Sequence, residues 1–404
     1  MSQADHIAAL EQDSPQAVAP VSTIPWRDGA LGLAGMTLAW LLVMAIRPHP
    51  LVGAWIVLLA TAAPMLAAEL HRAPAVERRR QGWAPLAFAI GLALAVLPFL
   101  LFHTQGSGFY IWLSAWAVVV PAFLLRCVVE WARTGALSGG LPAALGCALL
   151  GRDWGGLRAL SPSARLWALK AIFIPLYATS LLALVRLGLA SQPVTVIDWL
   201  TLAVLFAFTV DLAFGLSGYP FASNDVAPTV RSTQPRLIGW LVCLACYGPI
   251  FTHWPAFKTV VHAEIGWPRH LELSLSRTLA AAVMLALLVL YVWATVVFGL
   301  RFSNLANRGV LAAGPYRLMK HPAYFAHAAN AWILCFMLLP AAGIDLGSSQ
   351  LLVPLAFTVL YWARARTEEV HMREDPDYLA YERWIARHGL LARMLGLARR
   401  LVSR

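Results

Sequence analysis

The chain has 404 residues, of which 60% are hydrophobic and only 13% are charged, and its formal net charge is +11. Soluble domains average about 45–50% apolar and about 25% charged residues, so this composition excludes an ordinary soluble protein and predicts an integral membrane protein. A positive charge of this kind is typical of basic cytoplasmic loops that face anionic lipids, so we expect no nucleic acid partner.

The N-terminal segment lacks the positively charged region with which a signal peptide begins. Its first residues, MSQADHIAALEQDSPQ, include Asp5, Glu11 and Asp13 but no lysine or arginine. We therefore expect residues 1–28 to form a disordered cytoplasmic leader.

Ten apolar runs follow, most of them close to the roughly 20 residues that cross a bilayer as a helix. They cover residues 29–46, 51–68, 84–102, 109–125, 166–185, 199–218, 237–254, 279–300, 324–339 and 351–363. If the N-terminus is cytoplasmic and the spans alternate, 26 of the 31 lysines and arginines fall in cytoplasmic segments. This asymmetry follows the positive-inside rule. We expect an all-α polytopic integral membrane protein of about ten transmembrane helices, both termini cytoplasmic, in a bacterial inner membrane.

The first seven spans, within residues 29–272, form a helix bundle to which the sequence assigns no role. Asp211 lies in the middle of one of these spans, LTLAVLFAFTVDLAFGLSGYP. A carboxylate at membrane depth is costly and is therefore a functional candidate. The alternative is a helix–helix hydrogen bond to a serine, a tyrosine or the backbone.

Metal-binding and nucleotide-binding signatures are missing from the sequence. Cys243 and Cys246 form a CxxC pair inside an apolar run, but no second pair accompanies them. We expect no metal site and assign the five cysteines to helix packing.

The C-terminal part, residues 273–404, contains the stretch GPYRLMKHPAYFAHAANAW at 314–332. A residue before proline avoids the helical region, and proline suits the first turn of a helix, so His321 should stand where the ninth span begins at Pro322. Free N–H groups at that helix end, with Arg317 and Lys320 beside them, favour a carboxylate or a phosphate. The alternative is that these basic side chains anchor the helix end to lipid headgroups.

The tenth span has only 13 apolar residues, or about 20 Å of helix, which is short of a hydrocarbon core of about 30 Å. The helix must therefore continue through Arg364, Arg366, Glu368 and Glu369 near headgroup depth. Arg364–Glu368 and Glu369–Arg373 have the spacing of solvated i,i+4 pairs, yet one of the two glutamates can face inward. The two helix ends together predict a pocket for a zwitterionic water-soluble ligand and a lipid-embedded partner.

Three motifs in this order resemble a known family: KHPAY at 320–324, EE at 368–369 and YLAY at 378–381. The pattern is similar to that of the isoprenylcysteine carboxyl methyltransferases and the related bacterial phospholipid methyltransferases, over residues 279–388. Lys320 replaces the commoner arginine, and Ala326 stands where a glycine is usual.

The resemblance implies that S-adenosylmethionine binds between the last two helices and the C-terminal segment. The cofactor-binding residues that it implies are Gly314, Pro315, Tyr316, His321, Pro322, Tyr324, Glu368, Glu369, Tyr378 and Tyr381. We expect Arg317 or Lys320 to orient the acceptor and His321 to accept a proton. The acceptor would be a membrane lipid or another amphiphile at the cytoplasmic membrane face.

Two other functions fit the same sequence. Membrane sterol reductases resemble the C-terminal hairpin and its HP-x-Y signature, so an NADPH-dependent reductase is the first alternative. A non-catalytic or transport protein is the second, indicated by Asp211 and the large N-terminal bundle.

The C-terminal tail YLAYERWIARHGLLARMLGLARRLVSR mixes aromatic and aliphatic residues with arginines. Such a basic amphipathic segment should lie on the anionic lipids of the inner leaflet and cover the pocket. We expect Gly389 to break it into two helices.

Overall fold

The computed structural model describes residues 20–72, 161–222, 230–247, 254–270 and 274–402, together with residue 150 and several residues between 117 and 132. Six helices within these ranges are long and apolar enough to cross a membrane. They are Asp28–Ile46, Pro50–Arg72, Ala164–Ala190, Val196–Phe221, Leu275–Val296 and Pro322–Ala341. An all-α membrane protein is therefore the class that the fold supports. The predicted span 84–102 and most of 109–125 lie outside the described residues.

The described part of the N-terminal bundle contains four long helices. They are α2 (Asp28–Ile46), α3 (Pro50–Arg72), α7 (Ser161–Ala190) and α8 (Val196–Phe221). Apolar side chains such as Trp40, Met65, Phe173 and Phe214 are fully or almost fully buried between them. Helix α8 begins with a capping box, in which Thr195 and Asp198 satisfy each other's backbone N–H groups.

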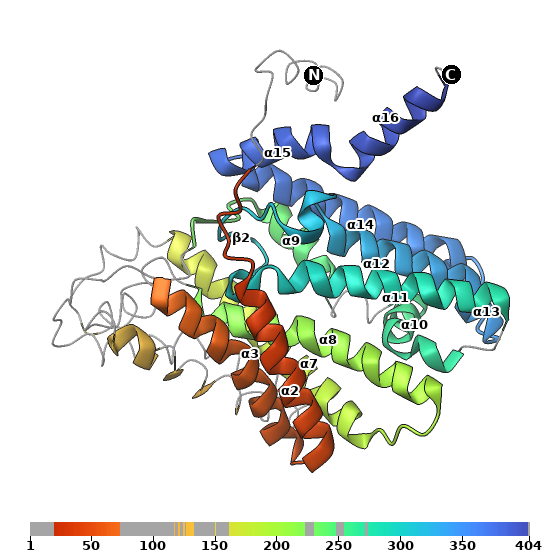
Figure 1. Ribbon diagram of the computed structural model, residues 1–404, viewed down its shortest axis with the longest axis horizontal. Coiled ribbons are helices and arrows are strands. Elements are labelled where there is room, and N and C mark those ends of the chain that lie inside the picture. Colours follow the sequence, from red (N-terminus) through yellow and green to blue (C-terminus); the bar gives the residue numbers. More distant parts are fainter. Residues whose placement is uncertain are drawn as a thin grey trace.

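The C-terminal core is a set of helices that lie side by side (Figure 1). It comprises α11 (Leu275–Val296), α12 (Pro322–Ile333) with a π-helical turn (Leu334–Leu338) and α13 (Leu339–Ala341), and α14 (Ser349–Met372). Pro322 occupies the first turn of α12 and His321 lies outside the helical region, as the His-Pro pair predicts. Helix α14 runs unbroken through the charged residues after position 363, as predicted from its short apolar part.

The predicted seventh span is not one helix over its described part. Helix α9 (Leu237–Ala245) has nine residues, and residues 248–253 lie outside the described ranges. Helix α10 (Pro255–Gly266) then begins with a proline in its first turn and packs against α8, α12 and α14. The sequence gives no prediction of α10, because its apolar content is too low for a membrane span.

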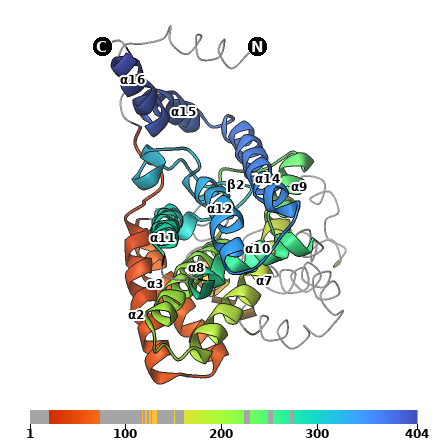
Figure 2. The same cartoon turned by 90° about the vertical axis from the view of Figure 1, so that its right-hand side faces the viewer.

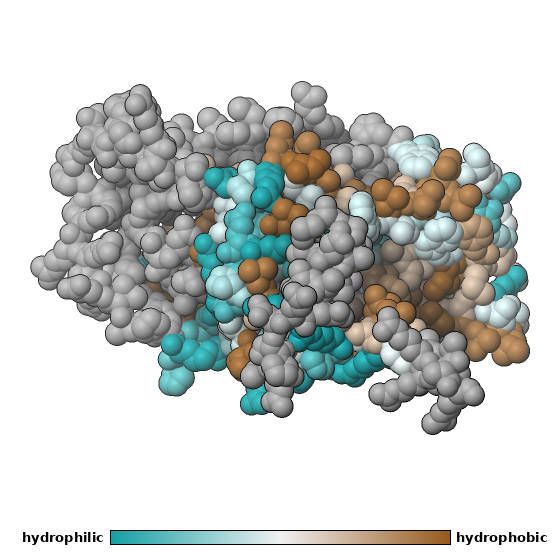
Figure 3. All heavy atoms as spheres, turned by 90° about the horizontal axis from the view of Figure 1, so that it is seen from above, coloured by the Kyte–Doolittle hydropathy of each residue, from teal (hydrophilic) through white to brown (hydrophobic). Residues whose placement is uncertain are grey.

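Two short strands connect the halves of the chain. Ser232–Thr233 (β1) pairs antiparallel with Ala306–Asn307 (β2). The C-terminal tail forms α15 (Pro376–His388) and α16 (Leu390–Val402), and both lie on one side of the molecule (Figures 1 and 2). Seen from that side, hydrophilic residues gather in the middle of the surface and apolar residues lie toward α13 (Figure 3).

Gly389 separates α15 from α16, as predicted. A Cβ atom at this position would lie 2.6 Å from the carbonyl oxygen of Ile385 and 3.2 Å from that of Leu318. Only glycine leaves room for the close approach that places the tail beside the turn before α12.

Candidate functional site

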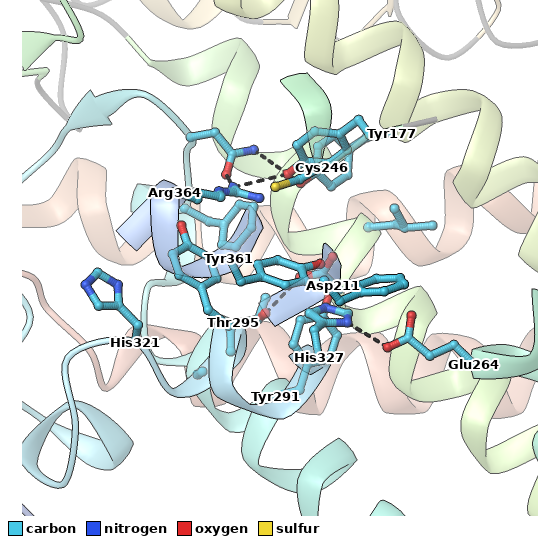
Figure 4. Close-up of a pocket in the computed structure, with 18 of the residues that line it drawn as sticks. Tyr177, Asp211, Cys246, Glu264, Tyr291, Thr295, His321, His327, Tyr361 and Arg364 are labelled. Carbon is cyan, nitrogen blue, oxygen red and sulfur yellow. Dashed lines mark hydrogen bonds and ion pairs between the residues drawn. The ribbon is translucent and has the colours of Figure 1, made fainter. Parts of the chain in front are cut away.

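A cavity of about 420 Å³ lies between α7, α8, α10, α11, α12 and α14. Its lining residues come from positions 176 to 368, so the N-terminal bundle and the C-terminal core both form its wall. Figure 4 shows polar side chains along its whole length, from His321 at one end to Glu264 at the other.

The first turn of α12 and the last turns of α14 meet at one end of this cavity, as the sequence predicts. The hydroxyl of Tyr324 donates a hydrogen bond to Oε2 of Glu368 over 2.6 Å. The imidazole of His321 stacks on the Tyr324 ring at a centroid distance of 5.2 Å. All three side chains line the cavity; Glu368 is therefore the glutamate of the pair that reaches the cavity, although its side chain is exposed.

Glu369 lines neither this cavity nor the one next to it; it is buried among basic side chains and an imidazole. Its carboxylate accepts a hydrogen bond from Nε2 of His321 over 3.1 Å and lies 3.5 Å from Nζ of Lys320. Arg366 and Arg373 are 3.3 and 3.8 Å away. Burial by itself would raise the pKa of Glu369, but the His321 hydrogen bond and the neighbouring positive charges lower the pKa to about 2.

A second carboxylate, from α15, completes this network. Glu382 accepts a hydrogen bond of 2.7 Å from Lys320 and two hydrogen bonds of 2.9 and 2.8 Å from Arg373. Burial raises the pKa of Glu382, and these two cations outweigh that effect and lower the pKa overall. The start of α12, the end of α14 and α15 are thereby held together by paired charges.

A smaller cavity of about 70 Å³ adjoins the first one and shares Tyr316, Lys320, His321 and Glu368 with it. Its other walls are the backbone segment 307–311 and the tyrosines of the YLAY motif. The Tyr381 hydroxyl donates to the carbonyl oxygen of Tyr316 over 2.7 Å. The Tyr378 hydroxyl is buried and has no hydrogen-bond partner in the described part of the chain.

Besides Glu369, four of the predicted residues lie outside the linings of these two cavities. Gly314 and Pro315 form the 3₁₀ turn before α12, where Gly314 adopts a φ of +56° close to Trp293. Pro322 is buried in the first turn of α12. Arg317 is exposed, with its guanidinium 5.6 Å from the centre of the Trp384 ring.

Arg364 does not form the predicted i,i+4 ion pair with Glu368. It is buried, and its Nη2 donates to Oδ1 of Asn304 over 2.5 Å. Its guanidinium lies over the rings of Tyr324 and Tyr247, at 4.8 and 5.5 Å from their centres. Among the described residues no carboxylate pairs with this cation, and it lines the main cavity.

The far half of the cavity contains polar residues of both halves of the chain. Asp211 of α8 accepts a hydrogen bond of 2.8 Å from Thr295 of α11, so the helix–helix alternative is observed, and the residue also lines the cavity. Nδ1 of His327 lies 2.8 Å from Oε1 of Glu264. Neither His327 nor Glu264 is predicted from the sequence, because no motif contains them.

Comparisons with known proteins add no relative: no family model, no curated protein and no solved structure matches the chain. Among the described residues, no group of three or more His, Cys, Asp or Glu side chains could hold a metal ion. Fold and site together define an all-α membrane protein with a cavity inside its helices that both polar and apolar side chains line. Its function has to follow from the chemistry of that cavity.

Proposed function

We propose that this protein transfers a methyl group from S-adenosylmethionine to a lipid-embedded or amphiphilic acceptor at the cytoplasmic membrane face. One observation carries the proposal. A guanidinium and a carboxylate, Arg364 and Glu368, lie one turn apart on α14 and line the same cavity. Neither is in an ion pair within the described part of the chain; Glu368 is exposed, whereas Arg364 is buried, where an unpaired charge is costly. An amino acid offers the two complementary groups, a carboxylate and an ammonium.

The rest of the cofactor finds suitable surroundings nearby. A cavity of about 420 Å³ is within the range of about 300–1,000 Å³ for small-molecule sites. The rings of Tyr324 and Tyr361 stack in its wall with their centres 5.6 Å apart, and aromatic faces attract cations such as a sulfonium. The adjoining small cavity would take part of the nucleoside, where the unpaired Tyr378 hydroxyl offers a hydrogen bond.

Glu369 has a different part in this proposal from the one that the family resemblance implies. Its carboxylate already pairs with Lys320, Arg366 and Arg373 and with the imidazole of His321, so it is a positioning residue for Lys320 and His321. Glu368, whose only described polar partner is the Tyr324 hydroxyl, is the carboxylate available to an ammonium group.

The chain itself needs no covalent chemistry. S-adenosylmethionine, when bound, supplies an activated methyl group. The protein has to hold the acceptor atom in line with that group and keep water out, which proximity and an enclosed cavity provide. The apolar stretches of the cavity wall, such as Leu176, Leu212 and Phe357, suit the hydrocarbon part of an amphiphile.

The proposal is tested by calorimetric titration of the purified protein, in detergent, with S-adenosylmethionine, S-adenosylhomocysteine and NADPH. We expect the first two ligands to bind and NADPH not to bind. Glu368→Gln should weaken S-adenosylmethionine binding by roughly 10- to 100-fold, as expected for a lost charge-assisted hydrogen bond. The matched control is Glu374→Gln, because Glu374 lies just beyond α14, is half exposed and lines neither cavity. It should bind like the wild type.

Two results would overturn the proposal. The first is that neither S-adenosyl ligand binds at millimolar concentration. The second is equal affinity in Glu368→Gln and wild type. Binding of NADPH alone would favour a membrane reductase instead.

A further inference from the structure

The half of the main cavity farthest from His321 contains a histidine–glutamate pair that several side chains hold in place. His327 lies one turn beyond Tyr324 on α12, and Glu264 reaches it from α10. Both side chains line the cavity and are largely shielded from solvent, with 17% and 11% of their side chains exposed. Ionisable groups at this depth in a helix bundle mark functional sites.

The imidazole of His327 is fixed on three sides (Figure 4). Oε1 of Glu264 lies 2.8 Å from Nδ1. The ring of Tyr361 stacks on the imidazole at 5.4 Å, and the ring of Tyr291 meets its edge at 4.6 Å. Carboxylates only accept hydrogen bonds, so Nδ1 carries the proton and Nε2 of the neutral ring keeps its lone pair. No described residue hydrogen-bonds to Nε2.

His321, the histidine that the sequence predicts as proton acceptor, is arranged differently. Its Nε2 is held by the carboxylate of Glu369, which also pairs with Lys320, Arg366 and Arg373. A base needs a free nitrogen that faces the reacting proton. Both histidines keep one nitrogen without a described partner, but Glu264 pairs with His327 alone within the described part of the chain, whereas Glu369 is shared among several basic side chains.

We propose that His327, oriented by Glu264, is the catalytic base of this protein and that the acceptor is an amphiphile with a hydroxyl group, an alcohol or a phenol. This inference depends on the proposed function. A carboxylate acceptor is already ionised at neutral pH and requires no base, whereas a hydroxyl must lose its proton when its oxygen is methylated. The hydroxyl proton goes to Nε2 of His327. The oxygen forms a bond to the methyl carbon while the bond from that carbon to sulfur breaks, and the sulfur keeps the electron pair. The products are a methyl ether, S-adenosylhomocysteine and an imidazolium paired with Glu264.

Two amphiphilic probes separate the acceptor classes. Purified wild-type protein is incubated with S-adenosylmethionine labelled in its methyl group and with either 4-octylphenol or dodecanoic acid. We expect labelled ether from 4-octylphenol and no methyl ester from dodecanoic acid. The rate with 4-octylphenol should fall as the pH is lowered, because a protonated imidazole cannot accept the hydroxyl proton.

Three variants connect the reaction to the pair. His327→Gln should lower the rate with 4-octylphenol by about 100-fold or more and abolish the fall in rate at acidic pH. Glu264→Gln should lower the rate by roughly tenfold, because a neutral partner still orients the ring but no longer stabilises the imidazolium. Both should bind S-adenosylmethionine as the wild type does, which also shows that they fold. His49→Gln, an exposed histidine between α2 and α3, is the matched control and should keep the full rate.

Titration of 4-octylphenol into the protein saturated with S-adenosylhomocysteine gives a readout without turnover. Its affinity should fall several-fold in His327→Gln. The inference is overturned by a wild-type rate in His327→Gln, by faster methylation of dodecanoic acid, or by no methylation of either probe in a protein that binds S-adenosylmethionine. Failure of the wild type to bind S-adenosylmethionine would instead remove the proposed function, and this inference with it.

Discussion

Replacement of Glu369 by glutamine tests how the site is held together. The pKa of this carboxyl group is about 2 in the folded protein and 4.5 in an exposed side chain. This difference makes the ionised form about 3 kcal/mol more favourable in the folded protein. Because the pKa is lowered by folding, the stabilisation is complete above about pH 5 and is lost as the pH falls from there toward 2. Glu369→Gln keeps the shape of the side chain but removes this contribution.

Thermal unfolding in detergent measures the effect. At pH 7 we expect the Tm of Glu369→Gln to be roughly 3–5 °C below that of the wild type, and the gap should narrow at pH 3. Glu374→Gln, with an exposed side chain that pairs with Arg236 over 3.7 Å, should differ little at either pH. S-adenosylmethionine binding should weaken only modestly, because the residue positions the site and does not contact the ligand. A Tm equal to that of the wild type at pH 7, or a gap that is the same at both pH values, would refute this reasoning.

The remaining predictions concern α15 and α16. Tyr378→Phe should leave the Tm unchanged or slightly higher, because the hydroxyl is buried without a described partner. The same variant should weaken S-adenosylmethionine binding about fivefold in the calorimetric titration. An unchanged affinity would place the nucleoside elsewhere. Asp375→Asn should lower the free energy of unfolding at pH 7 by about 1–3 kcal/mol, because Asp375 accepts hydrogen bonds of 2.7 Å from Asn307 and 2.8 Å from Arg231. A wild-type Tm in thermal unfolding would show that these contacts contribute nothing. Hydrogen exchange in residues 390–402 should be slower in nanodiscs with anionic lipid than in nanodiscs with zwitterionic lipid. The reason is that Leu391 and other apolar side chains of α16 are exposed beside arginines. Equal exchange rates would contradict a lipid-bound tail.

Much of the local structure follows from the sequence because its causes are local. Apolar runs predict the long helices, the His-Pro pair predicts the start of α12, and Gly389 predicts the break between α15 and α16. The continuation of α14 beyond residue 363 follows from a length argument alone. The same spacing argument indicates that only one of Glu368 and Glu369 faces the pocket, although it does not say which one.

The opposite wall of the cavity could not be predicted in this way. Glu264 and His327 are 63 residues apart, and helical periodicity shows which residues share a face but not which helix that face meets. Arg364 has a glutamate at the favourable i+4 position, so the local rule predicts a solvated pair. Instead, the rings of Tyr247 and Tyr324 and the amide of Asn304 surround its guanidinium, and this arrangement depends on packing between distant segments.

Ultraviolet cross-linking with methyl-labelled S-adenosylmethionine, followed by peptide mapping, tests the central claim most directly, because it reports both binding and place. The proposed site predicts label in peptides that cover residues 314–327 or 361–381, and its loss when unlabelled S-adenosylhomocysteine is added in excess. Label confined to α2 and α3, or no competition by S-adenosylhomocysteine, would contradict a cofactor site between α12 and α14.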